Sequence, residues 1–245
     1  MRAHMKIAVL EMGLLSEALQ EKHGNFFTMI QTWLNSAVQG TDIKLSFERF
    51  SICQGDLLPK AEAFDAYVIS GSKHSVYEDL PWIAQSKAFL NELKDKHIPM
   101  FGICFGHQLM AEAFGGKVEK SHKGWGFGTD RYEFEHGAQE VLVVHQDQVV
   151  QLPESAQVQG QSSHCEYGVL AYDFAAKSTQ FHPEFTKELV NDLLHQYQET
   201  VGVAQTQAAL AHLPEACLDN RLFAQQIIAF FQAHLSESTC ALSSK

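Results

Sequence analysis

The amino-acid sequence predicts an α/β fold in which a doubly wound, mainly parallel sheet is flanked by helices. Short apolar runs typical of buried parallel strands alternate with helical segments up to about residue 116. The 245 residues are 45% hydrophobic, which is enough to build a sizeable core. No internal repeat or low-complexity linker divides the sequence, so we expect one domain over residues 1–235. The final segment, residues 236–245, predicts a disordered tail.

The alternation of strands and helices is clearest in the first half of the chain. Lys6–Leu10 is a short, mainly apolar run, which predicts a buried first strand. Asn25 is a favourable N-cap, so we expect a helix to begin at Phe26, and Pro81 suits the first turn of a later helix. In chain order, we expect strands over residues 6–10, 43–52, 66–69 and 99–105 and helices over residues 26–34, 81–97 and 107–114.

The second half of the chain has a different pattern. Between Lys117 and Gln180 the sequence predicts strands over residues 132–134, 141–144, 149–152 and 167–172. After Pro183 it predicts helices over residues 189–197 and 222–235. These elements extend the same domain.

The charge balance excludes several classes of partner. The chain carries 18 Lys and Arg against 29 Asp and Glu, a formal net charge of −11. Such an acidic protein is poorly suited to bind a nucleic-acid backbone or an anionic membrane surface. No apolar run approaches the roughly 18 residues of a membrane span. The N-terminal segment also lacks the apolar region of a secretion signal.

The cysteines and histidines do not predict a structural metal or a disulfide framework. The five cysteines are an odd count, widely spaced and without a C-x-x-C pair. The 13 histidines include no H-x-x-x-H pair, so we expect no metal, and nothing in the sequence predicts another cofactor. A reducing cytoplasm fits this pattern best.

Residues 102–108, Gly-Ile-Cys-Phe-Gly-His-Gln, lie where a predicted buried strand meets a predicted helix. The pattern is the thiol form of the G-x-S-x-G nucleophile elbow, whose glycines allow strand and helix to approach at a sharp turn. The helix N-terminus favours a thiolate at Cys104 and directs backbone N–H groups toward a developing oxyanion. The alternative is a buried structural cysteine in a glycine-rich turn.

A thiol nucleophile needs a base and a group that orients the base. The segment Gln-Phe-His-Pro-Glu at residues 180–184 contains both. Pro183 favours extended geometry at the residue before it, so His182 and Glu184 can lie on the same side of the chain. Taken alone, this motif is more often a histidine at a strand end beside a solvated glutamate than a catalytic pair.

Together the two motifs resemble the class I, triad-type glutamine amidotransferase family. Residues 70–76 resemble the family's glycine turn after the third strand, and residues 113–118 resemble its helix exit. Residues 144–147 resemble the H-x-D element of stand-alone and GMP-synthase-like members. The similarity covers roughly residues 5–190 in consistent order, and jointly the motifs are highly specific. It implies the amidotransferase-like, flavodoxin-like form of the doubly wound fold.

The resemblance assigns roles residue by residue. It makes Cys104 the nucleophile, His182 the base and then the acid, and Glu184 the orienting group. The oxyanion hole is expected from the backbone N–H of Phe105 and one from Gly71 or Ser72. The resemblance also assigns a set of substrate-binding residues, namely Gln108, Ser163, His164, Cys165 and Tyr167.

Two interpretations stay open for His145 and Asp147, and two for His74. His145 and Asp147 either recognise an ammonia acceptor or partner, or they cap their loop. His74 is either a pocket residue or a solvated loop residue, the second being more common.

The implied activity is hydrolysis of the glutamine side-chain amide through a γ-glutamyl thioester on Cys104. The sequence contains no GxxxxGK[ST] phosphate loop, so either a separate synthase subunit accepts the ammonia or the enzyme releases it to solvent. Two alternatives stay open. One is a γ-glutamyl peptidase that uses the same three residues on a larger leaving group, and the other is a non-catalytic binding protein on this fold.

Overall fold

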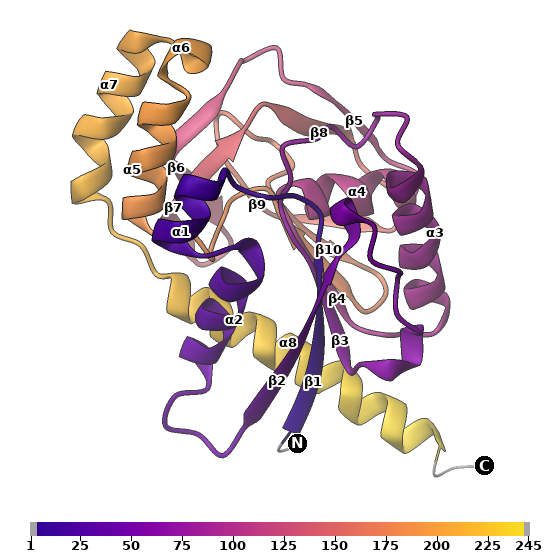
Figure 1. The fold of residues 1–245 in the computed structure, drawn as a ribbon. Helices are drawn as coiled ribbons and strands as arrows, with labels where there is room; N and C mark the ends of the chain where they lie inside the picture. The colour runs from indigo at the N-terminus through magenta and orange to yellow at the C-terminus, as the bar shows by residue number, and fades with distance from the viewer. Residues whose placement is uncertain (1–3, 243–245) are drawn as a thin grey trace.

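A mixed sheet forms the centre of the molecule (Figure 1). The computed structural model describes residues 4–242, with side chains for residues 4–235. Within this part of the chain the sheet has nine strands in the order β2-β1-β3-β4-β11-β10-β9-β6-β7. The first five are mutually parallel and the last four run antiparallel to their neighbours. The expected mainly parallel, doubly wound α/β fold is confirmed.

The parallel strands are β1 His4–Glu11, β2 Lys44–Ser51, β3 Ala66–Ile69, β4 Met100–Ile103 and β11 Ala176–Thr179. The antiparallel strands are β6 Gly126–Phe134, β7 Gly137–His145, β9 Ala156–Gln161 and β10 Val169–Tyr172. A small antiparallel pair joins β5 Lys117–Lys120 to β8 Asp147–Gln151. Because the parallel strands share a direction, residues that follow β1, β3, β4 and β11 meet at one edge of the sheet.

Helices cover both faces of the parallel strands. Helices α2 Phe26–Ala37 and α8 Asn220–Leu242 pack together on one face, and α3 Pro81–Asp95 and α4 Phe105–Ala113 cover the other (Figure 1). A third group packs near the β6–β7 hairpin: α1 Glu17–His23, α5 Lys187–Gln196, α6 Gln198–Val201 and α7 Val203–His212. Short 3-10 turns occur at Ile52–Gln54, Ala61–Ala63 and Leu213–Glu215.

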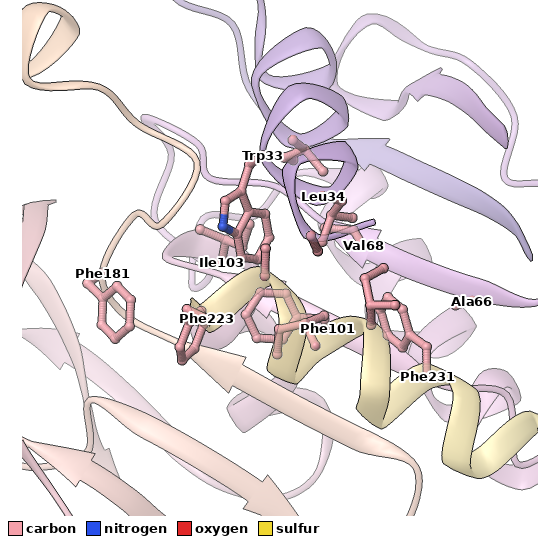
Figure 2. Close-up of a cluster of buried hydrophobic side chains, with 14 of the residues drawn as sticks. Trp33, Leu34, Ala66, Val68, Phe101, Ile103, Phe181, Phe223 and Phe231 are labelled. Carbon is pink, nitrogen blue, oxygen red and sulfur yellow. The ribbon is translucent and has the colours of Figure 1, made fainter. Parts of the chain in front are cut away.

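The core between α2, α8 and the sheet is rich in aromatic rings (Figure 2). Trp33 of α2 lies 5.9 Å from Phe101 of β4, measured between ring centroids. Phe223 of α8 lies 6.1 Å from Phe101 and 5.1 Å from Phe181. Phe181 follows β11, so this core fixes the position of the segment that contains His182.

Most predicted elements are present, but their ends shift, most of all in β6, which begins at Gly126 rather than at residue 132. Asn25 caps α2 through a full capping box, and Pro81 occupies the first turn of α3. The expected strand over residues 99–105 is too long, because Phe105 already belongs to helix α4. The sequence does not predict strands β5, β9 and β11 or helices α1, α6 and α7, all of which are present.

The C-terminal region differs from the expected tail. Helix α8 continues to Leu242, whereas a disordered tail is expected from Ser236. Residues 243–245 lie outside the described part of the chain. That residues 1–235 form one domain stays a prediction. Among residues 4–242, no helix combines the length and apolar character needed to cross a membrane.

Candidate active site

Cys104 lies at the sharp turn between strand β4 and helix α4. Its backbone has φ 52° and ψ −101°, a conformation with positive φ that non-glycine residues rarely adopt. The turn is held by a hydrogen bond of 2.8 Å from the Cys104 N–H to the Thr179 carbonyl of β11. Strained backbone of this kind persists only where its surroundings enforce it, and it is common at functional sites.

The two glycines of the elbow are needed for close packing. A Cβ on Gly106 would overlap the carbonyl oxygen of Ile69 in β3. A Cβ on Gly102 would lie 2.6 Å from the backbone carbonyl of Gly106. The glycines therefore let β3, β4 and the first turn of α4 approach each other, as the sequence pattern predicts.

His182 and Glu184 form a buried pair directly after β11. The Nδ1 of His182 lies 2.8 Å from Oε1 of Glu184, and only 3% of His182 and 4% of Glu184 are exposed. The segment is anchored by the His182 N–H, which donates to the Leu142 carbonyl of β7 at 2.8 Å. Burial alone would lower the pKa of His182, but the charges of Glu184 and Cys104 outweigh it and raise this pKa to about 10. The site thus favours an imidazolium.

Gly71 brings the two halves of the site together. A Cβ on Gly71 would lie 3.0 Å from Cε1 of His182 and 3.8 Å from Cβ of Cys104. Residues 70–72, the Cys104 turn and His182 therefore surround the same point. In the described chain, the N–H groups of Gly71 and Phe105 donate to no protein acceptor. They are available to a ligand oxygen at this point.

The structure adds Gln180, a buried residue that the sequence analysis did not single out. Gln108 Nε2 of α4 donates to the Asp147 carbonyl at 2.8 Å and to Oε1 of Gln180 at 3.0 Å. The Nε2 of Gln180 is buried and has no hydrogen-bond partner in the described chain. The signal was its position in the same motif as His182 and Glu184.

Residues 162–167 form a tight loop beside the site. The Ser162 hydroxyl accepts the N–H groups of His164 and Cys165 at 3.2 and 2.9 Å. Burial raises the pKa of Cys165 to about 12, so its thiol stays protonated. Ser163 is exposed, and Tyr167 is partly buried. Among the described atoms, Nε2 of His164 is buried without a hydrogen-bond partner.

His145 and Asp147 differ in their surroundings. The His145 ring is buried, and its centroid lies 5.8 Å from that of His164. Burial, together with the nearby His164 and His182, lowers the pKa of His145 to about 3, so the imidazole is neutral. Asp147 accepts hydrogen bonds from the Ser75 and Tyr77 hydroxyls at 2.5 and 3.2 Å. Its side chain thereby ties the start of β8 to the loop after β3.

Two other residues from the sequence analysis have structural partners. His74 Nδ1 lies 2.9 Å from Oε2 of Glu78 in the same loop. Ser72 packs against Gly13, and its hydroxyl accepts the His74 N–H at 3.1 Å.

The site itself is closed around the thiol. Only 5% of Cys104 is exposed, and its Sγ lies 3.8 Å from the Val144 carbonyl. Two cavities of about 610 and 300 Å³ lie elsewhere, beside helix α8, and both are lined by Lys177 and Gln226. Neither cavity is lined by Cys104 or His182. The candidate site is therefore identified from the positions of its side chains and not from a cavity.

Two relatives show what the chain is similar to in sequence. The chain is 31% identical over 147 residues to γ-glutamyl peptidase 4 of Arabidopsis thaliana, covering 54% of this chain and 59% of the relative. It is 28% identical over 221 residues to the glutamine-hydrolysing GMP synthase of Azoarcus sp., covering 79% of this chain and 37% of the synthase.

The fold is also found among solved structures. A crystal structure of a glutamine amidotransferase from Thermotoga maritima superposes with a TM-score of 0.71 at 17% identity. The superposition covers 95% of this chain and 98% of that one. The sequence profile described as glutamine amidotransferase class-I matches residues 25–195, and these contain Cys104, His182 and Glu184. The chain therefore belongs to the class I glutamine amidotransferase family.

Proposed function

We propose that this protein is a thiol hydrolase that releases ammonia from the side-chain amide of glutamine. The observation that carries the proposal is the placement of Cys104, at a positive-φ turn and a helix N-terminus, against the buried His182–Glu184 pair. Cys104 is the nucleophile, His182 transfers the proton and Glu184 orients the imidazole.

The first half of the reaction forms a thioester. The Cys104 thiolate attacks the γ-carbonyl carbon, and the carbonyl electron pair moves onto oxygen. The N–H groups of Phe105 and of Gly71 or Ser72 hold this oxyanion. When the pair returns, the C–N bond breaks, and the nitrogen leaves as ammonia with the proton of the His182 imidazolium.

The second half returns the enzyme to its starting state. The now neutral His182 removes a proton from water, and the resulting hydroxide attacks the thioester carbon. Collapse of this second tetrahedral species breaks the C–S bond and releases glutamate. Glu184 stabilises the imidazolium in both halves through the 2.8 Å hydrogen bond.

Substrate contacts are proposed for the residues around this centre. Gln108 would hold the amino-acid end of the substrate from the first turn of α4, next to Nε2 of Gln180, which has no partner among the described residues. The remaining contacts are proposed for Ser163, His164, Cys165 and Tyr167 in the loop beside the site.

An ammonia acceptor would be a separate synthase subunit. The Azoarcus relative is a glutamine-hydrolysing GMP synthase, of which this chain matches only 37%. His145 is proposed to face such a partner or the leaving group, because its neutral ring adjoins His182. For Asp147, the contacts with Ser75 and Tyr77 favour a role in holding the loop. A cytoplasmic location stays a prediction.

A γ-glutamyl peptidase is the second candidate, favoured by the similarity to the Arabidopsis peptidase. The same thioester chemistry applies, but the leaving nitrogen belongs to a second amino acid. A non-catalytic binding protein on this fold is the third candidate, and the buried His182–Glu184 pair beside Cys104 counts against it.

The test is release of ammonia and glutamate by purified protein from glutamine and, separately, from a panel of γ-glutamyl dipeptides, with Cys104→Ser as control. Turnover of glutamine that disappears in the variant supports the proposal. Turnover mainly of dipeptides assigns the protein to the peptidases. No turnover of any γ-glutamyl amide, together with an unreactive Cys104, supports the binding protein.

A further inference from the structure

Phe185 lies flat against the imidazole ring of His182. The two ring centroids are 3.9 Å apart and the planes differ by 10°. Only 4% of Phe185 is exposed, so this contact is shielded from water. Phe26 stacks on Phe185 with centroids 6.0 Å apart and an interplanar angle of 25°. Three rings from helix α2 and the segment after β11 therefore form one stack that ends at His182.

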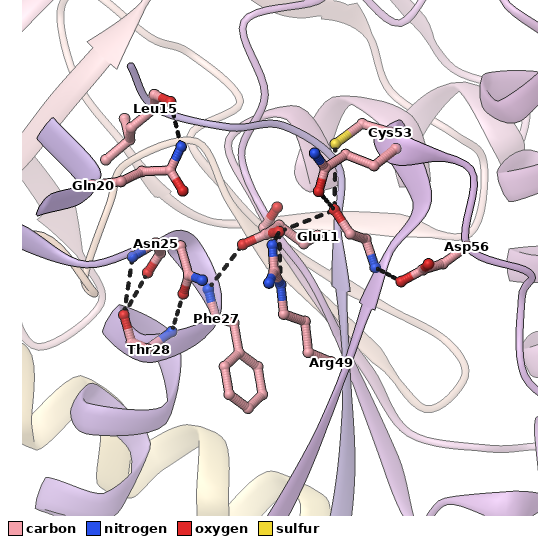
Figure 3. A network of polar contacts seen from close by, with 12 residues as sticks. Glu11, Leu15, Gln20, Asn25, Phe27, Thr28, Arg49, Cys53 and Asp56 are labelled. Atoms are coloured by element: carbon pink, nitrogen blue, oxygen red, sulfur yellow. Dashed lines mark hydrogen bonds and ion pairs between the residues drawn. The ribbon is translucent and has the colours of Figure 1, made fainter. Parts of the chain in front are cut away.

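The far end of the stack, Phe26, belongs to the first turn of α2. Figure 3 shows the polar contacts that hold this turn. Asn25 caps this turn, and its side chain accepts the Thr28 N–H at 2.9 Å. The buried carboxylate of Glu11 accepts the Phe27 N–H at 3.4 Å and is itself bound by Arg49 Nε at 2.9 Å. Phe26, the first residue of the helix, is thus held from both sides.

The near end of the stack is fixed by the start of α8. The Asn220 side chain donates to the Phe185 carbonyl at 3.2 Å. The edge of the His182 ring meets Gly71, where a Cβ would come within 3.0 Å of Cε1. The imidazole is therefore bounded by Phe185 on one face and by Gly71 at one edge.

The hydrogen bond from His182 to Glu184 leaves the tilt of the imidazole plane unconstrained. It fixes the position of Nδ1 but does not by itself fix the plane of the ring. A parallel aromatic face supplies that restraint. The negative face of a phenyl ring also attracts a cation above it, and the attraction strengthens when both groups are desolvated.

We propose that Phe185, supported by Phe26, is a positioning residue that holds the His182 ring in the plane joining Glu184 to Cys104 and stabilises its protonated form. The kinetic consequence rests on the proposed function, but the effect on His182 itself does not. The charged and titratable groups that act on His182 are Glu184, Cys104 and His145. Phe185 carries no charge, so its effect is separable from theirs.

The test follows the ring signals of His182 by NMR with isotope-labelled histidine as pH is raised, using full-length protein. We expect Phe185→Leu to lower the titration midpoint of His182 by about half a pH unit. Phe26→Leu, which removes only the supporting ring, should lower it by less. Phe89→Leu, a buried phenylalanine of α3, is the matched control and should leave it unchanged.

A turnover measurement completes the test. Phe185→Leu should lower kcat about threefold to tenfold with little change in KM, because it alters the proton-transfer group and leaves the substrate contacts in place. The inference would be overturned if Phe185→Leu and Phe26→Leu both had the same His182 titration midpoint and the same kcat as Phe89→Leu. The NMR result is independent of turnover. A lowered midpoint in a protein that hydrolyses no γ-glutamyl amide would support the stack and reject only the proposed function. If Phe185→Leu does not fold, Phe26→Leu decides.

Discussion

At the scale of single residues, the site depends on a few atoms whose surroundings leave little room for change. Cys104 is held at positive φ by its bond to Thr179, and His182 is held by Leu142, Glu184 and Phe185. These restraints come from β11, from β7 and from the segment after β11. The chemistry of the pair is therefore sensitive to small substitutions that leave the fold unchanged.

The nucleophile and the proton-transfer residue should act as one unit. Cys104→Ser and His182→Ala should each lower kcat by about a thousandfold or more, and the double variant should lose little beyond either single change. The measurement is steady-state turnover, with circular dichroism to verify the fold. Substantial activity in Cys104→Ser would sink the assignment of the nucleophile.

Glu184 should contribute less to turnover than His182 does. Glu184→Gln keeps a hydrogen-bond acceptor for Nδ1 but removes the charge that raises the pKa of His182. We expect kcat to fall by about tenfold to a thousandfold, and the alkaline limb of its pH profile to move to lower pH. The check is a pH–rate profile of both proteins. An unmoved alkaline limb would show that Glu184 does not control His182.

The residue scale also shows what the sequence predicts and what it cannot. Cys104, His182 and Glu184 lie in local motifs, so their neighbours in the chain identify them. Phe185 directly follows one motif, but a phenylalanine there is indistinguishable from a core residue without knowing that Phe26 packs on it. Gln180 is similar, since its contact with Gln108 depends on how β11 lies against α4.

At the scale of elements, prediction succeeds where a local signal marks the start of a helix. Asn25 and Pro81 both begin helices where expected, because capping and proline preferences act within one turn. Strand β11 was missed although it is central. Its sequence, Ala-Lys-Ser-Thr, has neither a long apolar run nor clear alternation, and only pairing with β4 and β10 makes it a strand.

The elbow between β4 and α4 should tolerate no side chain at Gly106. A methyl group there would overlap the Ile69 carbonyl, so Gly106→Ala should destabilise the fold by about 3 kcal/mol or more. Gly40 is the matched control. It has positive φ but open space around it, so Gly40→Ala should cost only about 1 kcal/mol. Urea unfolding of both variants gives the comparison, and equal losses would contradict the packing argument.

At the scale of the whole molecule, the site lies where the parallel half of the sheet meets the antiparallel half. Cys104 follows the parallel strand β4. His182 follows β11, which is parallel to β4 on one side and antiparallel to β10 on the other. Helix α7 lies outside residues 25–195, which the family model matches. It packs against β6 in the antiparallel half of the sheet. Its Gln205 donates to the Trp125 carbonyl at 2.9 Å, beside the strand pair that contains His145.

The buried histidines should give the molecule a stability maximum near neutral pH. Burial lowers the pKa of His107 and of His145 to about 3, so folding excludes protons that the unfolded chain binds below about pH 6.5. The contribution of these two neutral histidines to the free energy of unfolding is therefore lost as the pH falls below about 6.5. The raised pKa of His182 acts oppositely, and its contribution is complete below about pH 6.5 and is lost as pH rises toward 10.

Urea midpoints measured from pH 4 to pH 10 test this expectation at about one-unit intervals. The midpoint should be highest near pH 6.5 to 7 and fall on both sides. His182→Ala should flatten the alkaline side only. A midpoint that rises steadily from neutral to alkaline pH would contradict the assigned imidazolium.

The proposed function depends on Cys104 being the group that attacks a γ-glutamyl carbonyl. The most direct measurement reacts the protein with an electrophilic glutamine analogue, with and without excess substrate, and maps the modified peptide by mass spectrometry. We expect one label, on Cys104, whose formation is slowed by substrate and nearly abolished in His182→Ala. A label on another cysteine, such as the exposed Cys217, or labelling of Cys104 that neither substrate nor His182→Ala affects, would contradict it.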